Sequence, residues 1–155
     1  MGYLWLTLAL VAALVVVGLI SRRWRAQSSR DQAQQAMAQF EARRYEMAAR
    51  FLQAAAATGK PRGLRWTSVE LTGPPIFVTD SSSGALCAFV GATISFEAVE
   101  GGDMEEVEAV GNLRSATAVF VFRRGEWMTD GRVIFNLEPA EAVERFQSSL
   151  RPFIP

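Results

Sequence analysis

The chain has 155 residues, half of them hydrophobic, and its 16 basic and 16 acidic side chains cancel to a net charge of zero. The absence of histidine excludes Ser–His–Asp and Cys–His nucleophile systems and imidazole metal sites. A single cysteine, Cys87, excludes an internal disulfide and a thiolate zinc cluster, and its apolar neighbours predict a buried, unreactive side chain. We therefore expect a protein that is not an enzyme and holds no cofactor or metal.

The first twenty residues form an uncharged apolar segment whose only hydroxyl groups are those of Tyr3 and Thr7. As a helix this segment would span about 30 Å, the thickness of the hydrocarbon core of a bilayer. Nothing basic precedes it, and it runs directly into Ser21 and Arg22 without the small-residue cleavage site of a signal peptide. Residues 1–20 are therefore predicted to be an uncleaved transmembrane anchor.

Charged and aromatic residues flank the predicted anchor. Arg22, Arg23 and Arg25 follow it and no basic residue precedes it, so the positive-inside rule predicts that the C-terminal domain is cytoplasmic. Trp5 and Trp24 fit the aromatic belts at the two membrane interfaces. The expected location is the cell membrane, crossed once, with the lipid bilayer as one partner.

Positive charge is concentrated next to the predicted anchor. Residues 21–65 carry ten basic and three acidic side chains, whereas residues 66–155 carry six basic and thirteen acidic ones. Basic charge beside a membrane is attracted to anionic lipid, and an acidic folded domain argues against nucleic-acid binding. Residues 21–60 are therefore predicted to be a basic juxtamembrane stalk.

The stalk is expected to be helical, because residues 25–58 are rich in Ala, Gln, Arg and Met and contain no Gly or Pro. Apolar residues recur at helical spacing, with Arg44 at a position where an apolar residue is due. Two shapes fit: one helix of about 50 Å, or a helical hairpin that breaks at residues 42–44. We favour an amphipathic helix that packs on the following sheet, and the candidates to cover that sheet are the C-terminal half of the stalk and the last helix.

From Pro61 the apolar pattern changes to a period of two, which predicts a globular domain over residues 61–155. The alternation predicts three long strands and two shorter ones, over residues 86–98, 115–122, 127–137, 64–71 and 76–79. In the strand over 127–137, Asp130 and Gly131 indicate an irregularity. Gly91, inside the longest strand, indicates a bend or close packing against an aromatic side chain.

Turn residues over 72–75, 80–84 and 124–125 separate these strands, and turns this short require antiparallel pairing. A last helix is predicted from Glu138–Pro139 to about Leu150. The expected fold class is α+β: an N-terminal transmembrane helix, a helical stalk, and a meander sheet of about five antiparallel strands with a C-terminal helix. One face of the sheet is expected to be covered by helix. This element order resembles those of cystatin-like and nuclear-transport-factor-like folds.

The densest charge cluster lies between two of the predicted strands. It places five carboxylates within nine residues: Glu100, Asp103, Glu105, Glu106 and Glu108. Calcium and magnesium prefer oxygen ligands, but the spacing is not that of an EF-hand loop. We interpret the segment as a solvated loop or as an acidic docking loop for a basic partner.

The stretch TISFEAVEGGDMEEVEAVGNLRSATAVFVFRRGEWMTDGRVIFNLEPAEAVERF is similar to sequences of uncharacterised bacterial proteins that are anchored in the membrane by a single span. The likeness extends over roughly residues 62–150. It implies a folded domain, and it brings no activity or site residues.

Three functions are compatible with these features. The first is a membrane-anchored, non-enzymatic interaction or assembly domain with an unidentified protein partner. The second is a small-ligand-binding module on a curved sheet, which would require Asn112, Arg114 or Asn136 to point into an apolar pocket. The third is a pilin-like subunit, although Thr7 stands where pilins have glutamate and the arginines after the span predict the opposite orientation.

Overall fold

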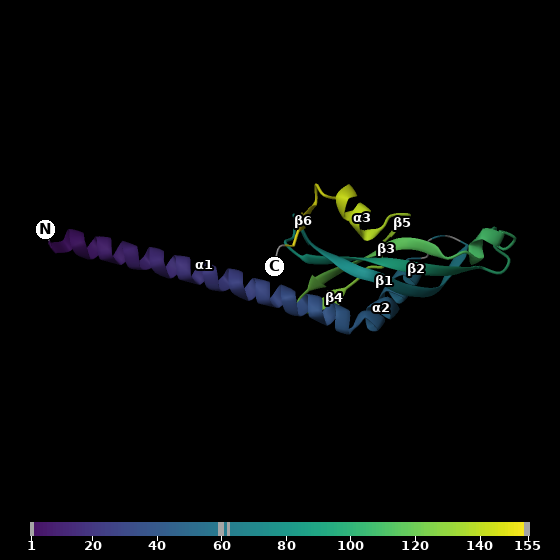
Figure 1. The fold of residues 1–155 in the computed structure, drawn as a ribbon, viewed down its shortest axis with the longest axis horizontal. Helices are drawn as coiled ribbons and strands as arrows, with labels where there is room; N and C mark the ends of the chain where they lie inside the picture. The colour runs from purple at the N-terminus through teal and green to yellow at the C-terminus, as the bar shows by residue number, and fades with distance from the viewer. Residues whose placement is uncertain (1, 59–60, 62, 154–155) are drawn as a thin grey trace. The chain divides into compact units, whose positions relative to one another are not determined.

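A computed structural model describes residues 2–58, 61 and 63–153, with the side chains of all but 2–13, 25–26, 28 and 108–109. The chain divides into two units, which we call the helical unit (residues 1–35) and the sheet unit (residues 36–154). Helix α1 (Gly2–Ala42) makes up the helical unit and contributes its last turns to the sheet unit (Figure 1).

The predicted stalk consists of two helices. Helix α1 ends at Ala42 and α2 (Arg44–Ala57) begins after a single residue, Arg43, whose φ of −111° and ψ of 21° are not helical. Past this break α2 continues away from the last turns of α1 and does not fold back along them (Figure 1). The break falls at the predicted position, but the chain forms neither one continuous helix nor a hairpin.

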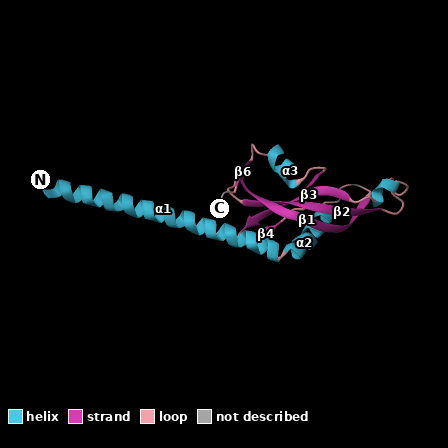
Figure 2. Ribbon diagram, in the orientation of Figure 1, coloured by secondary structure: helices cyan, strands magenta, loops and turns pink. Residues whose placement is uncertain are grey.

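The six antiparallel strands form one sheet in the order β4-β3-β2-β1-β6 (Figure 2). Strand β5 lies off this order and pairs with β3. The strands are β1 (Leu64–Asp80), β2 (Leu86–Ala98), β3 (Arg114–Arg123), β4 (Glu126–Met128), β5 (Val133–Phe135) and β6 (Leu150–Pro152). The remaining elements are a 3-10 helix, η1 (Glu108–Gly111), and helix α3 (Pro139–Arg145). The predicted α+β class, antiparallel sheet and C-terminal helix are confirmed.

One face of the sheet, which we call the helix face, packs against the end of α1 and against α2. Phe40 and Phe51 are fully buried there, and the ring of Phe40 lies 5.1 Å from the rings of both Phe120 and Trp127. The indole N–H of Trp127 donates a hydrogen bond to the carbonyl of Ala36, at 2.7 Å. The expected packing of the C-terminal half of the stalk on the sheet is thus confirmed.

The opposite face, which we call the α3 face, is also apolar. Its core contains Val78, Cys87, Phe89 and Val119, together with Ala142 of α3. Figure 1 shows α3 on the side of the sheet that faces away from α2. The sheet therefore has two buried faces, whereas alternation alone predicted one.

The two short strands predicted over 64–71 and 76–79 are a single strand, β1. Thr72 pairs with Gly91 and Ile76 pairs with Phe89, so residues 73–75 bulge out opposite Val90 and the strand keeps its direction. The predicted turn over 72–75 was therefore wrong. At this bulge a Cβ on Gly91 would lie 2.9 Å from the carbonyl oxygen of Thr72, so Gly91 allows a close approach of the β1 backbone.

The contacts of Arg44 explain why a basic residue interrupts the apolar stripe of the helix. Its guanidinium donates hydrogen bonds to the carbonyl oxygens of Leu71 and Gly73, on either side of the start of the bulge, and pairs with Glu41 at 3.1 Å. Leu71 is still paired with β2, whereas Gly73 is the first residue of the interruption in the ladder. A basic side chain at this position of α2 therefore stabilises the irregular part of β1.

We expect the change Arg44→Lys to destabilise the sheet unit by about 1–2 kcal/mol, because an ammonium group cannot make this forked set of bonds. The free energy of unfolding in urea measures the effect. Arg43→Lys, at the exposed neighbouring residue, is the matched control and should leave that free energy within about 0.5 kcal/mol of the wild-type value. Equal effects of the two changes would contradict the role of Arg44.

The predicted strand over 127–137 is interrupted where Asp130 and Gly131 indicated. Strand β4 pairs with the C-terminal end of β3, and β5 pairs with its N-terminal end. The residues that connect β4 to β5 pair with neither end of β3. The last helix is shorter than predicted: α3 ends at Arg145, and Leu150 begins β6, which pairs with the end of β1. Ser148 and Ser149 are poor helix formers, so the helix is not favoured beyond Arg145.

Among the residues whose side chains are described, no helix is long and apolar enough to cross a membrane. The predicted anchor, residues 1–20, lies mostly outside that set, because side chains are described only from Leu14 onward.

Candidate functional site

The α3 face contains a hollow, which we call the serine–arginine hollow. It consists of two adjoining cavities of about 590 and 380 Å³ that share four lining residues, Asp80, Phe89, Arg132 and Leu150. It exists because α3 has only seven residues, about 10 Å of helix, and cannot cover the whole face. Cavities of this size are typical of sites for small molecules.

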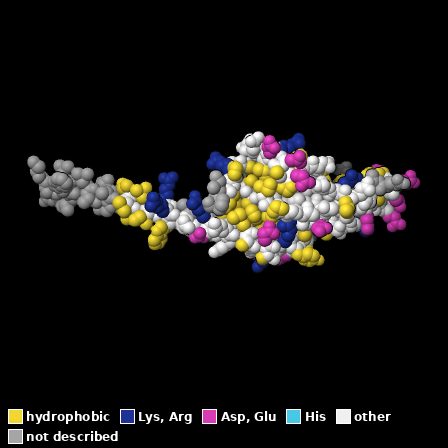
Figure 3. All heavy atoms as spheres, viewed as in Figure 1, with side chains coloured by type: hydrophobic (Ala, Val, Ile, Leu, Met, Phe, Trp, Pro, Cys, Tyr) yellow, Lys and Arg dark blue, Asp and Glu magenta, His cyan; other side chains and the backbone are white. Residues whose placement is uncertain are grey.

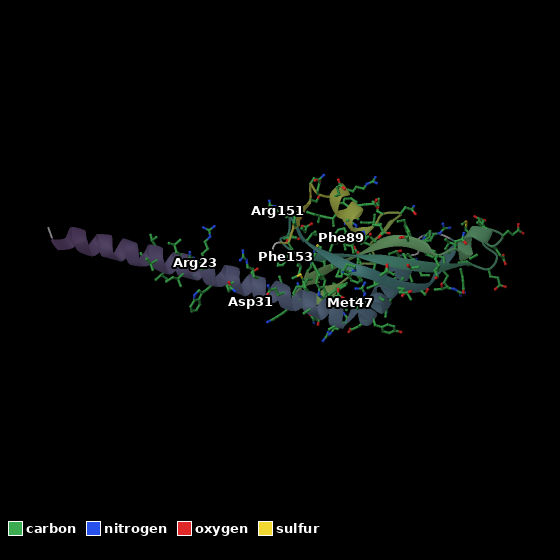
Figure 4. All side chains as sticks on the ribbon, viewed as in Figure 1. Arg23, Asp31, Met47, Phe89, Arg151 and Phe153 are labelled. Carbon is green, nitrogen blue, oxygen red and sulfur yellow. The ribbon has the colours of Figure 1, made fainter. Side chains whose placement is uncertain are left out.

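The floor of the hollow is apolar. Phe89, Cys87 and Val119 form it and are 4–7% exposed, while Leu150 and Val121 are partly buried beside them. Figure 4 labels Phe89, and Figure 3 shows hydrophobic side chains gathered on the surface of the sheet unit on this side of the sheet. The floor therefore suits an apolar group.

The rim of the hollow is polar and comes from segments far apart in the sequence. Ser81 and Ser82 follow β1, and Ser148 and Ser149 precede β6. The two segments are joined by a 2.8 Å hydrogen bond from the N–H of Ser81 to the carbonyl of Ser149. Hydroxyl groups are thereby placed on one side of an apolar floor.

Arg132 also lines the hollow, from the irregular segment between β4 and β5. Its guanidinium is 5.5 Å from the centre of the Phe146 ring, within the range of a cation–π contact. Its backbone is held by two hydrogen bonds, from its N–H to Oδ1 of Asp130 at 3.0 Å and from the N–H of Val119 to its carbonyl at 3.2 Å. The guanidinium of Arg132 is therefore positioned both by the hydrogen bonds of its own backbone and by the ring of Phe146.

Asp80 closes the turn between β1 and β2. Its Oδ1 accepts hydrogen bonds from the N–H and hydroxyl groups of both Ser82 and Ser83, at 2.6–3.1 Å. These bonds, that of the Ser82 hydroxyl first, stabilise the carboxylate and hold the pKa of Asp80 well below its ordinary value.

We expect this carboxylate to make the stability of the sheet unit depend on pH. Because the pKa of Asp80 is lower in the folded than in the unfolded chain, its contribution is present above about pH 4 and is lost as the pH falls further. The urea midpoint should therefore drop less between pH 5 and about pH 2.5 in Asp80→Asn than in wild type. Asp103→Asn, at an exposed loop position, should keep the wild-type drop; equal drops in all three proteins would refute the role of Asp80.

Cys87 behaves as predicted for a buried hydrophobe, since its side chain is buried and free. Burial raises the pKa of the Cys87 thiol, the charge of Asp80 raises it further, and the nearby Arg123 and Arg132 oppose this shift. The thiolate, which is the nucleophilic form, is therefore disfavoured at neutral pH.

A second hollow, which we call the loop hollow, lies on the helix face near the loop after β2. It has a volume of about 330 Å³, and its polar lining residues are Arg114 and Asn136. The other lining residues are apolar: Pro61, Leu64, Phe96, Met104, Val107, Val110 and Phe135. Two of the three polar residues that the ligand-binding hypothesis required are thus at an apolar pocket, and Asn112 does not line it.

The predicted acidic docking loop is at the surface. Glu100, Asp103, Glu105 and Glu106 are exposed, and Glu105 accepts a 2.8 Å hydrogen bond from the N–H of Gly101. The side chain of Glu108 lies outside the described residues. Within the part of the chain that is described, no three metal-ligating side chains are grouped so that they could hold an ion.

The predicted membrane-interface residues lie on α1. Arg22, Arg23 and Trp24 are exposed, Trp24 by 76%, and Figure 4 labels Arg23. The side chains of Trp5 and Arg25 lie outside the described residues.

Sequence reasoning missed the serine–arginine hollow. The serines at 81–82 were assigned to a turn and those at 148–149 to a helix, so nothing indicated that they lie together. The only signal was the run of apolar residues over 86–90, which is typical of a strand buried on both faces.

Comparison of the chain with models of protein families, with curated proteins and with solved structures finds no match. The resemblance of the element order to cystatin-like and nuclear-transport-factor-like folds therefore remains a likeness of element order.

Proposed function

We propose that the protein is a membrane-anchored, non-enzymatic interaction domain. In this proposal residues 1–20 are a transmembrane helix, the basic segment after them faces the cytoplasmic leaflet, and the sheet unit is the cytoplasmic binding domain. A basic protein partner docks on the acidic loop that contains Glu105 and Glu106.

The observation that supports anchoring best is the surface of α1. Leu14, Val15, Val16, Val17, Leu19 and Ile20 are 48–65% exposed. Four consecutive residues at 100° intervals cover the whole circumference of a helix, and a helix that is apolar all round needs an apolar surrounding such as lipid. Figure 3 shows basic side chains of α1 beside these apolar ones, as expected at the edge of a bilayer.

Extraction tests the anchor. The full-length chain should stay in membranes after an alkaline wash, because a spanning helix is not released when peripheral contacts are broken. Leu10→Arg combined with Leu14→Arg should release it, since each charge inside the bilayer costs about 3 kcal/mol. Gln34→Arg combined with Gln35→Arg, further along the same helix, should not. Release of the wild-type chain by the wash would refute the anchor.

A reporter that is active only outside the cytoplasm tests the orientation. Fused after Pro155, it should be inactive, because Arg22, Arg23 and Arg25 keep their side of the span in the cytoplasm. An active reporter would overturn the cytoplasmic location of the sheet unit.

Charge reversal tests the docking loop. Crosslinking in native membranes should give one heteromeric species, and Glu105→Lys combined with Glu106→Lys should abolish it, because like charges repel at an interface. Glu126→Lys combined with Glu144→Lys, at exposed positions of β4 and α3, is the matched control and should retain it. A monomer in wild type, or an unchanged complex in the loop variant, would contradict this docking site.

A second candidate function is a small-ligand-binding module, which the loop hollow favours. Arg114 and Asn136 are at the edge of an otherwise apolar pocket, the arrangement that orients a ligand with one polar end. Native mass spectrometry of the purified chain should then show a bound small molecule that is lost in Arg114→Ala and kept in Arg124→Ala, at an exposed turn. Absence of bound mass in the wild-type chain would refute this candidate.

A further inference from the structure

We infer that the serine–arginine hollow binds an amphiphile, a molecule with an unbranched apolar chain and one anionic end group such as a carboxylate or phosphate. This site is separate from the acidic docking loop and from the loop hollow. It does not depend on the membrane anchor.

The apolar chain is accommodated by the floor. Phe89, Cys87 and Val119 present an almost continuous apolar surface, which continues to Leu150 and Val121 at the edge of the two cavities. The two cavities share four lining residues, so they adjoin one another across the same apolar floor. A hydrocarbon chain that lies on this floor gains free energy by leaving water.

The anionic end is accommodated by an excess of hydrogen-bond donors. Arg132 and Arg123 line the hollow, and neither guanidinium belongs to an ion pair among the described residues. Each guanidinium has five N–H donors in a planar fork that matches the oxygens of carboxylate and phosphate. The hydroxyl groups of Ser81, Ser148 and Ser149 add further donors at the same rim.

Two carboxylates also line the hollow, and each is bound within its own turn. Oδ1 of Asp80 accepts four hydrogen bonds from Ser82 and Ser83, and Oδ1 of Asp130 accepts the backbone N–H of Arg132. Neither carboxylate neutralises an arginine of the hollow through an ion pair in the described part of the chain. The side-chain donors of Arg132 are therefore left for a ligand.

Photocrosslinking with a diazirine-bearing fatty acid tests the proposal, on the full-length chain in phosphatidylcholine nanodiscs. The probe should label residues that line the hollow. Unlabelled decanoate should compete, and decyltrimethylammonium, which has the same chain and the opposite charge, should not. Nanodiscs that contain phosphatidylglycerol separate the two sources of the anion: competition by this lipid indicates a phospholipid, and its absence indicates a free fatty acid.

Arg132→Gln should reduce labelling in the hollow by about tenfold or more, the loss expected for a charge-assisted hydrogen bond. Arg151→Gln, at an exposed position of β6 outside the hollow, is the matched control and should label like wild type. Phe146→Ala should also weaken labelling, because it removes the ring that positions Arg132.

Three outcomes would overturn the proposal. One is equal competition by the two amphiphiles. Another is undiminished labelling in Arg132→Gln. The third is labelling that Arg114→Ala abolishes and Arg132→Gln does not, which would place the probe in the loop hollow.

Discussion

Replacing Gly131 with alanine is expected to destabilise the sheet unit by about 3 kcal/mol or more, a large part of the stability of a small domain. A Cβ at this position would lie 2.4 Å from the backbone nitrogen of Ala55 and 2.6 Å from the carbonyl carbon of Ala54. Neither backbone atom can move without displacing α2. In addition, Gly131 has a φ of +77°, which strains any residue with a side chain.

Gly125→Ala is the matched control for this prediction. Gly125 has a similar φ of +85°, but a Cβ there would meet no atom within 4 Å. Its replacement should therefore cost only the backbone strain, about 1 kcal/mol. Urea unfolding, monitored by tryptophan fluorescence, measures both free energies of unfolding. A similar small loss of stability in the two variants would show that Gly131 does not pack against Ala54 and Ala55 of α2.

Phe40→Ala is expected to cost about 3–5 kcal/mol, because it removes a fully buried aromatic side chain and leaves a cavity. The ring of Phe40 makes edge contacts with the rings of Phe77, Phe120 and Trp127. Through these contacts it joins the last turn of α1 to the helix face of the sheet.

The control for Phe40 is Tyr45→Ala, an aromatic residue close by in the sequence that is 91% exposed. Its loss should change the free energy of unfolding by no more than about 0.5 kcal/mol. The same urea titration compares the two variants. A small effect of Phe40→Ala would mean that residues 36–42 are a spacer and not part of the core.

Elements whose pattern follows from a single buried face were predicted well. Strands β2 and β3 were predicted within one or two residues, and the start of α3 was predicted from Pro139, because alternation and capping are local properties. Strand β1 was predicted as two strands, because Thr72–Pro75 has the composition of a turn. Its identity as one bulged strand depends on pairing with β2, which local sequence does not encode.

The second buried face was missed for a related reason. Cys87, Phe89, Val119 and Val121 alternate with the residues of the helix face, and we treated them as the outer side of a one-sided sheet. Their partners come from the end of the chain, where Leu150 pairs with Asp80. Such contacts depend on tertiary structure, so the serine–arginine hollow could be found only once the fold was known.

The bulge in β1 has a consequence for self-association. Strand β1 is next to last in the sheet, and β6 pairs only with residues 78–80, so its outer edge from Leu64 to Phe77 has no neighbouring strand among the described residues. Open edges of this length are templates for fibril growth. In this edge Pro74 and Pro75 have no N–H to donate, and Arg44 already binds the carbonyl oxygens of Leu71 and Gly73. A strand from another copy therefore cannot form a continuous row of hydrogen bonds with β1.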